Sequence, residues 1–192
     1  MAQDRRKLMK DQLAESAEVK MKTIGACMDD MVKAAVALIE ALKKGHKVLI
    51  FGNGGSAADA QHIACELVSK FRLERKGLPA ISLTTNTSII SAISNDYDYK
   101  RVFERQIEAL GQKGDVAIGI STSGKSPNIL SALKLARKMG LVTIGMEGEK
   151  GRMRDEVDID ICVPSGDTPR IQEAHITIGH ILCDVVEKEL FE

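Results

Sequence analysis

Residues 121–126 read Ser-Thr-Ser-Gly-Lys-Ser, which places four hydroxyl side chains within six residues. The apolar run 116–120 precedes them, and Pro127 opens an amphipathic segment after them. Pro is favoured at the first helical position, and the serine before it suits the N-cap. The pattern therefore predicts a strand, a hydroxyl-rich loop and a helix start. Such a loop at a positive helix end can bind a phosphate monoester, although an ordinary capped turn has the same local pattern.

Four side chains on two predicted helices could hold a metal ion. They are His62 and Glu66 in the predicted helix 57–71, and Gln172 and His180 in the predicted helix 169–190. The first pair is spaced by four residues and the second by eight, so each pair lies on one side of its helix. Two imidazoles, a carboxylate and an amide oxygen suit a borderline divalent ion such as zinc. From spacing alone a surface His–Glu pair is the commoner interpretation, and Glu173 and His175 compete for the same role.

A glycine-rich loop, Gly52-Asn53-Gly54-Gly55-Ser56, follows the apolar strand pattern 47–51. Glycines allow a ligand to approach the backbone closely. The spacing is not G-x-G-x-x-G, and the next predicted strand carries no acidic residue at the distance that a ribose requires. We therefore exclude a dinucleotide site. The loop is still predicted to bind a ligand of another kind close to its backbone.

Alternating strand and helix patterns must position these groups. The predicted strands are 47–51, 79–83, 116–120, 142–146 and 158–163, and the predicted helices are 57–71, 84–94, 102–110, 128–139 and 169–190. This order predicts an α/β fold, a doubly wound and mostly parallel five-stranded sheet flanked by helices. We expect one domain, residues 1–192, with N-terminal helices over 1–44, an α/β core over 45–192 and a long C-terminal helix. Ligands bind beyond the carboxyl ends of such strands, so both loops should line one crevice.

Composition limits the classes of partner. Basic and acidic residues number 27 each in the 192-residue chain, so net charge favours neither a nucleic acid nor a membrane. No run of 18 apolar residues and no secretory signal pattern occurs, and we expect a cytoplasmic location. Cys27, Cys65, Cys162 and Cys183 are widely spaced within apolar patterns, which predicts buried free thiols.

The combined motifs resemble the phosphoheptose isomerases of the sugar isomerase (SIS) domain family, from about residue 30 to the end. Besides the two loops, the resemblance rests on Asp59, Asn95-Asp96 and residues 170–175. It implies one zinc ion per subunit, held by His62, Glu66, Gln172 and His180. It implies that a sugar phosphate is bound by Asn53, Gly54, Gly55, Ser56, Glu66, Asn95, Asp96, Ser121, Thr122, Ser123, Ser126 and Gln172. It also implies a homotetramer with active sites at the subunit interfaces.

The implied reaction converts D-sedoheptulose 7-phosphate to D-glycero-D-manno-heptose 7-phosphate, a first step toward ADP-heptose of the lipopolysaccharide core or a related heptose nucleotide. The resemblance assigns Glu66 as base and His180 as acid or base, with zinc polarising the substrate oxygens. A relative of the same fold is a non-enzymatic tetramer that associates with the replication initiator DnaA, and a sugar-phosphate sensor is a third alternative. The complete metal set favours the isomerase, because neither alternative needs it.

Overall fold

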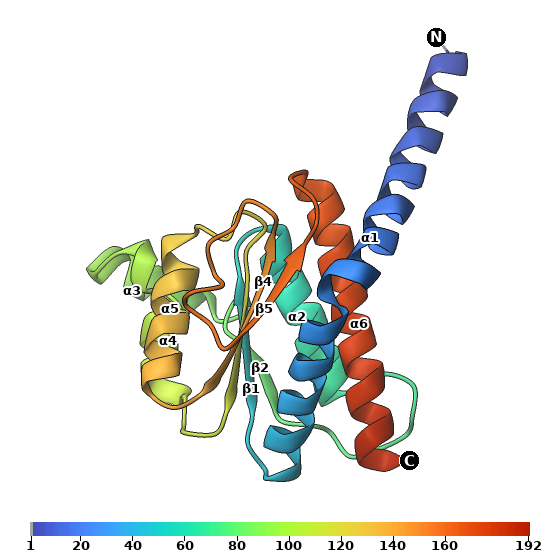
Figure 1. Cartoon of the computed structure of the whole chain (residues 1–192). Coiled ribbons are helices and arrows are strands. Elements are labelled where there is room, and N and C mark those ends of the chain that lie inside the picture. The colour runs from blue at the N-terminus through green and yellow to red at the C-terminus, as the bar shows by residue number, and fades with distance from the viewer. Residues whose placement is uncertain (1) are drawn as a thin grey trace.

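Five parallel strands form one sheet, in the order β2-β1-β3-β4-β5, in the computed structural model, which describes residues 2–192 (Figure 1). The strands are β1 (Val48–Gly52), β2 (Ala80–Ser82), β3 (Val116–Ile120), β4 (Val142–Gly148) and β5 (Ile159–Val163). The helices are α1 (Ala2–Lys43), α2 (Gly55–Val68), α3 (Thr87–Asp96), α4 (Glu104–Leu110), α5 (Pro127–Lys138) and α6 (Thr168–Phe191), with a 3-10 turn η1 at Tyr99–Arg101. The five-stranded α/β prediction is confirmed, and every strand pair described is parallel.

Helices cover both faces of the sheet. Helices α1, α2 and α6 pack on one face, and α3, α4 and α5 lie on the other (Figure 1). Successive side chains of β1 point to opposite faces of the sheet. Val48 and Ile50 pack with α1, α2 and α6, whereas Leu49 and Phe51 pack with the helices of the other face. This two-sided burial explains why the strands read as continuous apolar runs.

The N-terminal helix α1 is a single unbroken element, where the sequence predicted helices over 1–44. It ends before Gly45, whose φ of 78° is a left-handed conformation that favours glycine. Its C-terminal half packs on the core through residues such as Ala34 and Leu38. Its N-terminal part extends beyond the core, and residues 3–15 are exposed (Figure 1). A helix without tertiary contacts is only marginally stable, so this part requires further contacts.

A buried ion pair joins the end of α2 to α6. Arg75 Nε donates to Glu187 Oε1 at 2.8 Å, and the two side chains are 2% and 1% exposed. The Arg75 guanidinium also donates to the carbonyls of Glu66 and Leu67 in the last turn of α2. Since these carbonyls lack helical partners, one side chain completes α2 and attaches it to α6.

The Glu187 carboxylate is satisfied mainly by backbone donors. It accepts hydrogen bonds from the N–H groups of Phe71, Arg72 and Leu73 at 2.6–2.9 Å. Desolvation by burial would raise its pKa, but these bonds and that of Arg75 outweigh it and lower the pKa of Glu187 to about 2. The ionised form therefore holds the connection between α2 and β2 in place.

Replacing Glu187 with Gln should destabilise the chain by about 3–5 kcal/mol, because Arg75 is left buried without its charged partner. Glu189→Gln, on the same helix, removes an exposed pair with Lys43 and should cost under about 1 kcal/mol. Urea unfolding at neutral pH measures both values. Because folding lowers the pKa of Glu187, its stabilisation is present above about pH 4.5 and is lost toward pH 2. Equal losses in the two variants would contradict this role.

Candidate functional site

The two predicted loops lie side by side at the point where the strand order reverses. Strands β1 and β3 pair with Gly52 opposite Ile120, so the loops that follow them leave the same edge of the sheet. Asn53 and Asn128 join the loops by two reciprocal amide hydrogen bonds of 2.9 and 3.0 Å. Tyr99 Oη adds a third bond, to Asn53 Oδ1, at 3.1 Å. The two loops are therefore neighbours, as expected, while a crevice lined by both stays a prediction; the sequence pattern did not reveal the contacts of Asn128 and Tyr99.

The hydroxyl loop is arranged for an anion. Ser121 Oγ lies 3.1 Å from Ser126 Oγ and 3.4 Å from Ser123 Oγ, so three hydroxyls gather at the start of α5. Gly124 turns the loop with a φ of 60°. Ser126 occupies the N-cap position as predicted, but its side chain makes no capping bond. The Ile129 N–H instead donates to Asn128 Oδ1 at 3.1 Å, so the Ser126 hydroxyl is free of the helix backbone and can donate to a ligand such as phosphate at this positive helix end.

A cavity of about 190 Å³ opens beside this loop. It is lined by Thr122, Ser123, Lys125, Lys150, Ser165, Gly166, Thr168 and Ile171. Two lysines supply positive charge that hydroxyls lack. Lys150, Ser165 and Thr168 come from segments that the sequence indicated only as a loop, a turn and a helix start, and no local signal identified them.

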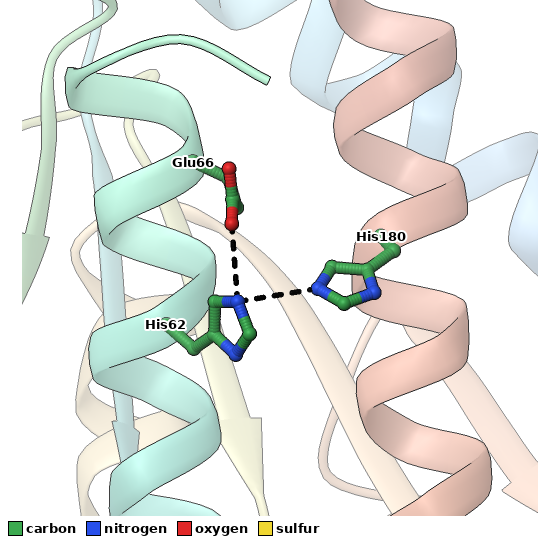
Figure 2. Close-up of side chains that lie close together, drawn as sticks. All are labelled: His62, Glu66 and His180. Carbon is green, nitrogen blue, oxygen red and sulfur yellow. Dashed lines mark hydrogen bonds and ion pairs between the residues drawn. The ribbon is translucent and has the colours of Figure 1, made fainter. Parts of the chain in front are cut away.

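Three of the four predicted metal ligands converge between α2 and α6. His62 and Glu66 project from α2 and His180 projects from α6, and the three point toward one another (Figure 2). His62 Nε2 lies 3.0 Å from Glu66 Oε1 and 3.3 Å from His180 Nε2. The His180 ring also packs against Phe71, with 5.6 Å between ring centroids.

These separations match the requirements of zinc. Zinc binds nitrogen and oxygen ligands at about 2.0–2.1 Å, and two tetrahedral ligands are then about 3.3 Å apart. The observed 3.0 and 3.3 Å are close to this value, and the three donor atoms all lie within 4.8 Å of one another. Two imidazoles and a carboxylate are also the donor types of catalytic zinc sites. The residues present therefore fit a zinc ion with an open position for substrate.

Gln172 lies next to the glycine loop. A methyl group on Gly55 would overlap the Gln172 carboxamide, so the glycine makes room for it. Gln172 is eight residues before His180, about 12 Å along the helix axis. No described contact joins Gln172 to the other three ligands, and its ligation of a metal stays a prediction. Its position suits a sugar hydroxyl above Gly54 and Gly55 equally well.

Asp59 stands between the glycine loop and the metal ligands on α2. Burial raises the pKa of Asp59 to about 6, although the nearby His62 lowers it. Its Oδ2 atom is buried without a hydrogen bond among the described residues. Ser56 is buried, and its predicted contact with substrate stays a prediction.

Asn95 and Asp96 lie on α3, which packs on the other face of the sheet from α2 and α6. They form the last turn of α3, where a polar turn was expected, and Asn95 Nδ2 donates to Asp96 Oδ1 at 2.8 Å. Helix α3 projects from the side of the domain opposite α6 (Figure 1). No described contact joins Asn95 or Asp96 to His180, and their part in substrate binding stays a prediction.

Comparison with known proteins matches the SIS domain family to residues 13–148. Phosphoheptose isomerase from Clostridium acetobutylicum is 56% identical over 183 residues, which is 94% of this chain and 93% of that protein. Phosphoheptose isomerase from Geobacter metallireducens is 60% identical over 156 residues, 81% of this chain and 82% of that protein.

Solved structures give the same relationship. A phosphoheptose isomerase from Neisseria gonorrhoeae superposes with a TM-score of 0.90 at 38% identity, covering 98% of this chain and 100% of that one. One from Francisella tularensis gives a TM-score of 0.91 at 35% identity, covering 98% and 99%. These matches extend over both loops and both helices that carry the site.

Ser126→Ala should weaken the binding of a phosphate monoester by roughly ten- to a hundredfold, because a hydrogen bond to a charged group is worth about 1.5–3 kcal/mol. Isothermal titration with inorganic phosphate measures the change. Ser131→Ala is the matched control, since its hydroxyl bonds the Lys100 carbonyl and lies more than one turn along α5 from Ser126. Unchanged phosphate affinity in Ser126→Ala would remove the loop from the site.

Proposed function

The chain belongs to the SIS domain family, and from that premise we propose that it is a phosphoheptose isomerase. The reaction interconverts the ketose D-sedoheptulose 7-phosphate and the aldose D-glycero-D-manno-heptose 7-phosphate. We place it at the first step of ADP-heptose synthesis for lipopolysaccharide, or of a related heptose nucleotide.

One observation carries this proposal. A hydroxyl loop suited to a phosphate and a cluster suited to zinc both flank the glycine loop, one on α5 and the other about two turns along α2. A long sugar phosphate, with its phosphate at one end and its carbonyl at the other, has the shape to reach both. Asn53, Gly54, Gly55 and Gln172 lie between the two ends, where sugar hydroxyls would bind.

The residues proposed to hold the metal would also carry out the proton transfers. A proton must leave C1 of the ketose and arrive at C2, by way of an enediol. Glu66 is the proposed base and His180 the proposed acid, because their reacting atoms converge with His62 at one point. Zinc held by His62, Glu66 and His180, with Gln172 as the proposed fourth ligand, would polarise the carbonyl oxygen as a Lewis acid. Glu66 then has to serve both as ligand and as base.

Assembly into a homotetramer would complete the site. Ile24, Met28, Val32 and Val36 recur at helical spacing along α1 and are all exposed. They continue into exposed Ile181 and Val185 on α6, and a groove of about 330 Å³ lies beside Val32 and Val185. A continuous apolar stripe of this kind favours packing against other copies of the chain. The projecting α3 could then bring Asn95 and Asp96 to a neighbouring site.

The initiator-associating scaffold is not favoured, because a scaffold needs no carboxylate beside two imidazoles. Among residues 2–192, none of the helices combines the length and apolar character that a membrane span requires. We retain the cytoplasm as the proposed location. Aldose formation from sedoheptulose 7-phosphate by zinc-loaded protein tests the function. Absence of that activity, together with tight binding of a protein partner, would support the scaffold instead.

Glu66→Gln should keep its zinc but lose turnover by about a hundred- to ten-thousandfold, since general acid–base catalysis contributes that much. The amide retains a ligating oxygen and removes the basic carboxylate. Glu108→Gln, which changes an exposed residue on α4, is the matched control and should retain full activity. Metal content and kcat are measured together. Retention of more than about a tenth of the activity, or a barrier change under about 1.4 kcal/mol, would show that Glu66 is not the base.

Val32→Glu should dissociate the tetramer, because it would bury a charge within the apolar stripe. Sedimentation velocity at micromolar concentration should detect a tetramer for the wild type and smaller species for the variant. Leu110→Glu, on the opposite side of the sheet, should leave assembly unchanged. A wild-type monomer under these conditions would exclude a shared active site.

A further inference from the structure

A second group of metal-ligating side chains lies outside the proposed active site. Glu147 is in β4, directly opposite Cys162 in β5, and Asp160 precedes Cys162 by two residues on the same face of the strand. One ligand atom from each of the three lies within 4.8 Å of the other two. Gly145, opposite Asp160, adds no side chain to the space between the strands.

This group is buried although two of its members are acids. Glu147 is 3% exposed and Asp160 is 8% exposed, where the sequence predicted a partly exposed final strand. Neither carboxylate oxygen of Asp160 has a hydrogen bond among the described residues. Its one described ion pair, 3.5 Å from Arg154 Nε, involves an arginine that is mostly exposed to solvent. Burying carboxylates with so few donors is costly unless a cation accompanies them.

We propose that Glu147, Asp160 and Cys162 bind a second divalent metal ion, of the borderline softness of zinc. A thiolate beside two carboxylates disfavours magnesium and calcium, which prefer oxygen ligands alone. Three anionic ligands, one divalent ion and the Arg154 guanidinium together carry no net charge. The burial of Glu147 and Asp160, rather than the number of ligands, assigns this ion a structural role.

The position of the group indicates what the ion would stabilise. Glu147 Oε2 accepts a hydrogen bond of 2.9 Å from the Met153 N–H, and the Glu147 carboxylate packs against Gly151 and against Gly124 of the hydroxyl loop. An ion here would join β4 and β5 to the connection between them, directly beneath the phosphate-binding loop. Its loss should therefore lower thermal stability and leave the proton-transfer groups intact.

The competing arrangement is a pair of carboxyl groups that retain a proton. Burial, together with the charge of Asp160, raises the pKa of Glu147 to about 7 although the Met153 N–H lowers it. The two arrangements differ in their thiol, because only a metal ion requires Cys162 as a thiolate.

Cobalt(II) is the probe that distinguishes them. The full-length protein, reduced, stripped of metal and reloaded, should bind two cobalt ions per chain and show a thiolate-to-cobalt charge-transfer band. A His62→Gln/His180→Gln variant, which lacks the first cluster, should bind one ion and keep the band. Cys162→Ser should lose the band and one ion. Cys65→Ser is the matched control, because Cys65 is exposed beside Glu66, and it should keep both.

Wild-type protein that binds a single ion without a thiolate band would overturn the proposal, whatever the variants do. Loss of the band in Cys65→Ser rather than in Cys162→Ser would also overturn it, since the thiolate would then belong to the first cluster. If Cys162→Ser fails to fold, Asp160→Asn takes its place and should bind the second ion at least tenfold more weakly. Isomerase activity plays no part in these measurements, so failure of the metal proposal and failure of the proposed function remain distinguishable.

Discussion

The buried pair of Arg75 and Glu187 is the constraint on which the arrangement of the proposed metal ligands depends. His62 and Glu66 lie on α2 and His180 on α6, so the relation between the two helices decides whether the ligand atoms meet. Arg75 holds the last carbonyls of α2, and Glu187 holds both Arg75 and the backbone that follows α2. An error of an ångström between the helices would separate the 3.0 and 3.3 Å contacts that suit one metal ion.

The sheet makes the complementary contribution, at the other end of the site. Because β1 and β3 are neighbours and the helices that follow them pack on opposite faces, the two loops leave the same edge of the sheet in different directions, an arrangement that favours a ligand crevice. The Asn53–Asn128 bonds then fix the spacing across it. Strand order thus positions the loop proposed to bind phosphate, and helix packing positions the side chains proposed to bind the metal.

Much of this could be predicted from local patterns. Apolar runs located the strands, and fixed spacings along one helix located His62 and Glu66. Asn128 and Lys150 were missed because their roles depend on neighbours that are distant in the chain. The burial of Asp160 was missed because alternation in an edge strand does not reveal that another connection covers it, and Cys65 proved exposed because its helix face is open. The part of Asn95 and Asp96 in substrate binding stays a prediction.

Ser126, at the N-cap of α5, makes no capping hydrogen bond, so a bound ligand could contribute to the stability of this helix. A serine at the N-cap commonly accepts a hydrogen bond from an early N–H of its helix, but here Ser126 faces Ser121 and the Ile129 N–H donates to Asn128 Oδ1. A bound phosphate would place acceptor oxygens at this helix end in place of the capping side chain, and would thereby stabilise α5. The helix α5 would then be less stable in the free protein than in the complex, and binding of a phosphorylated ligand would increase the stability of the fold. Unphosphorylated sugars, which provide no cap, would give no such increase.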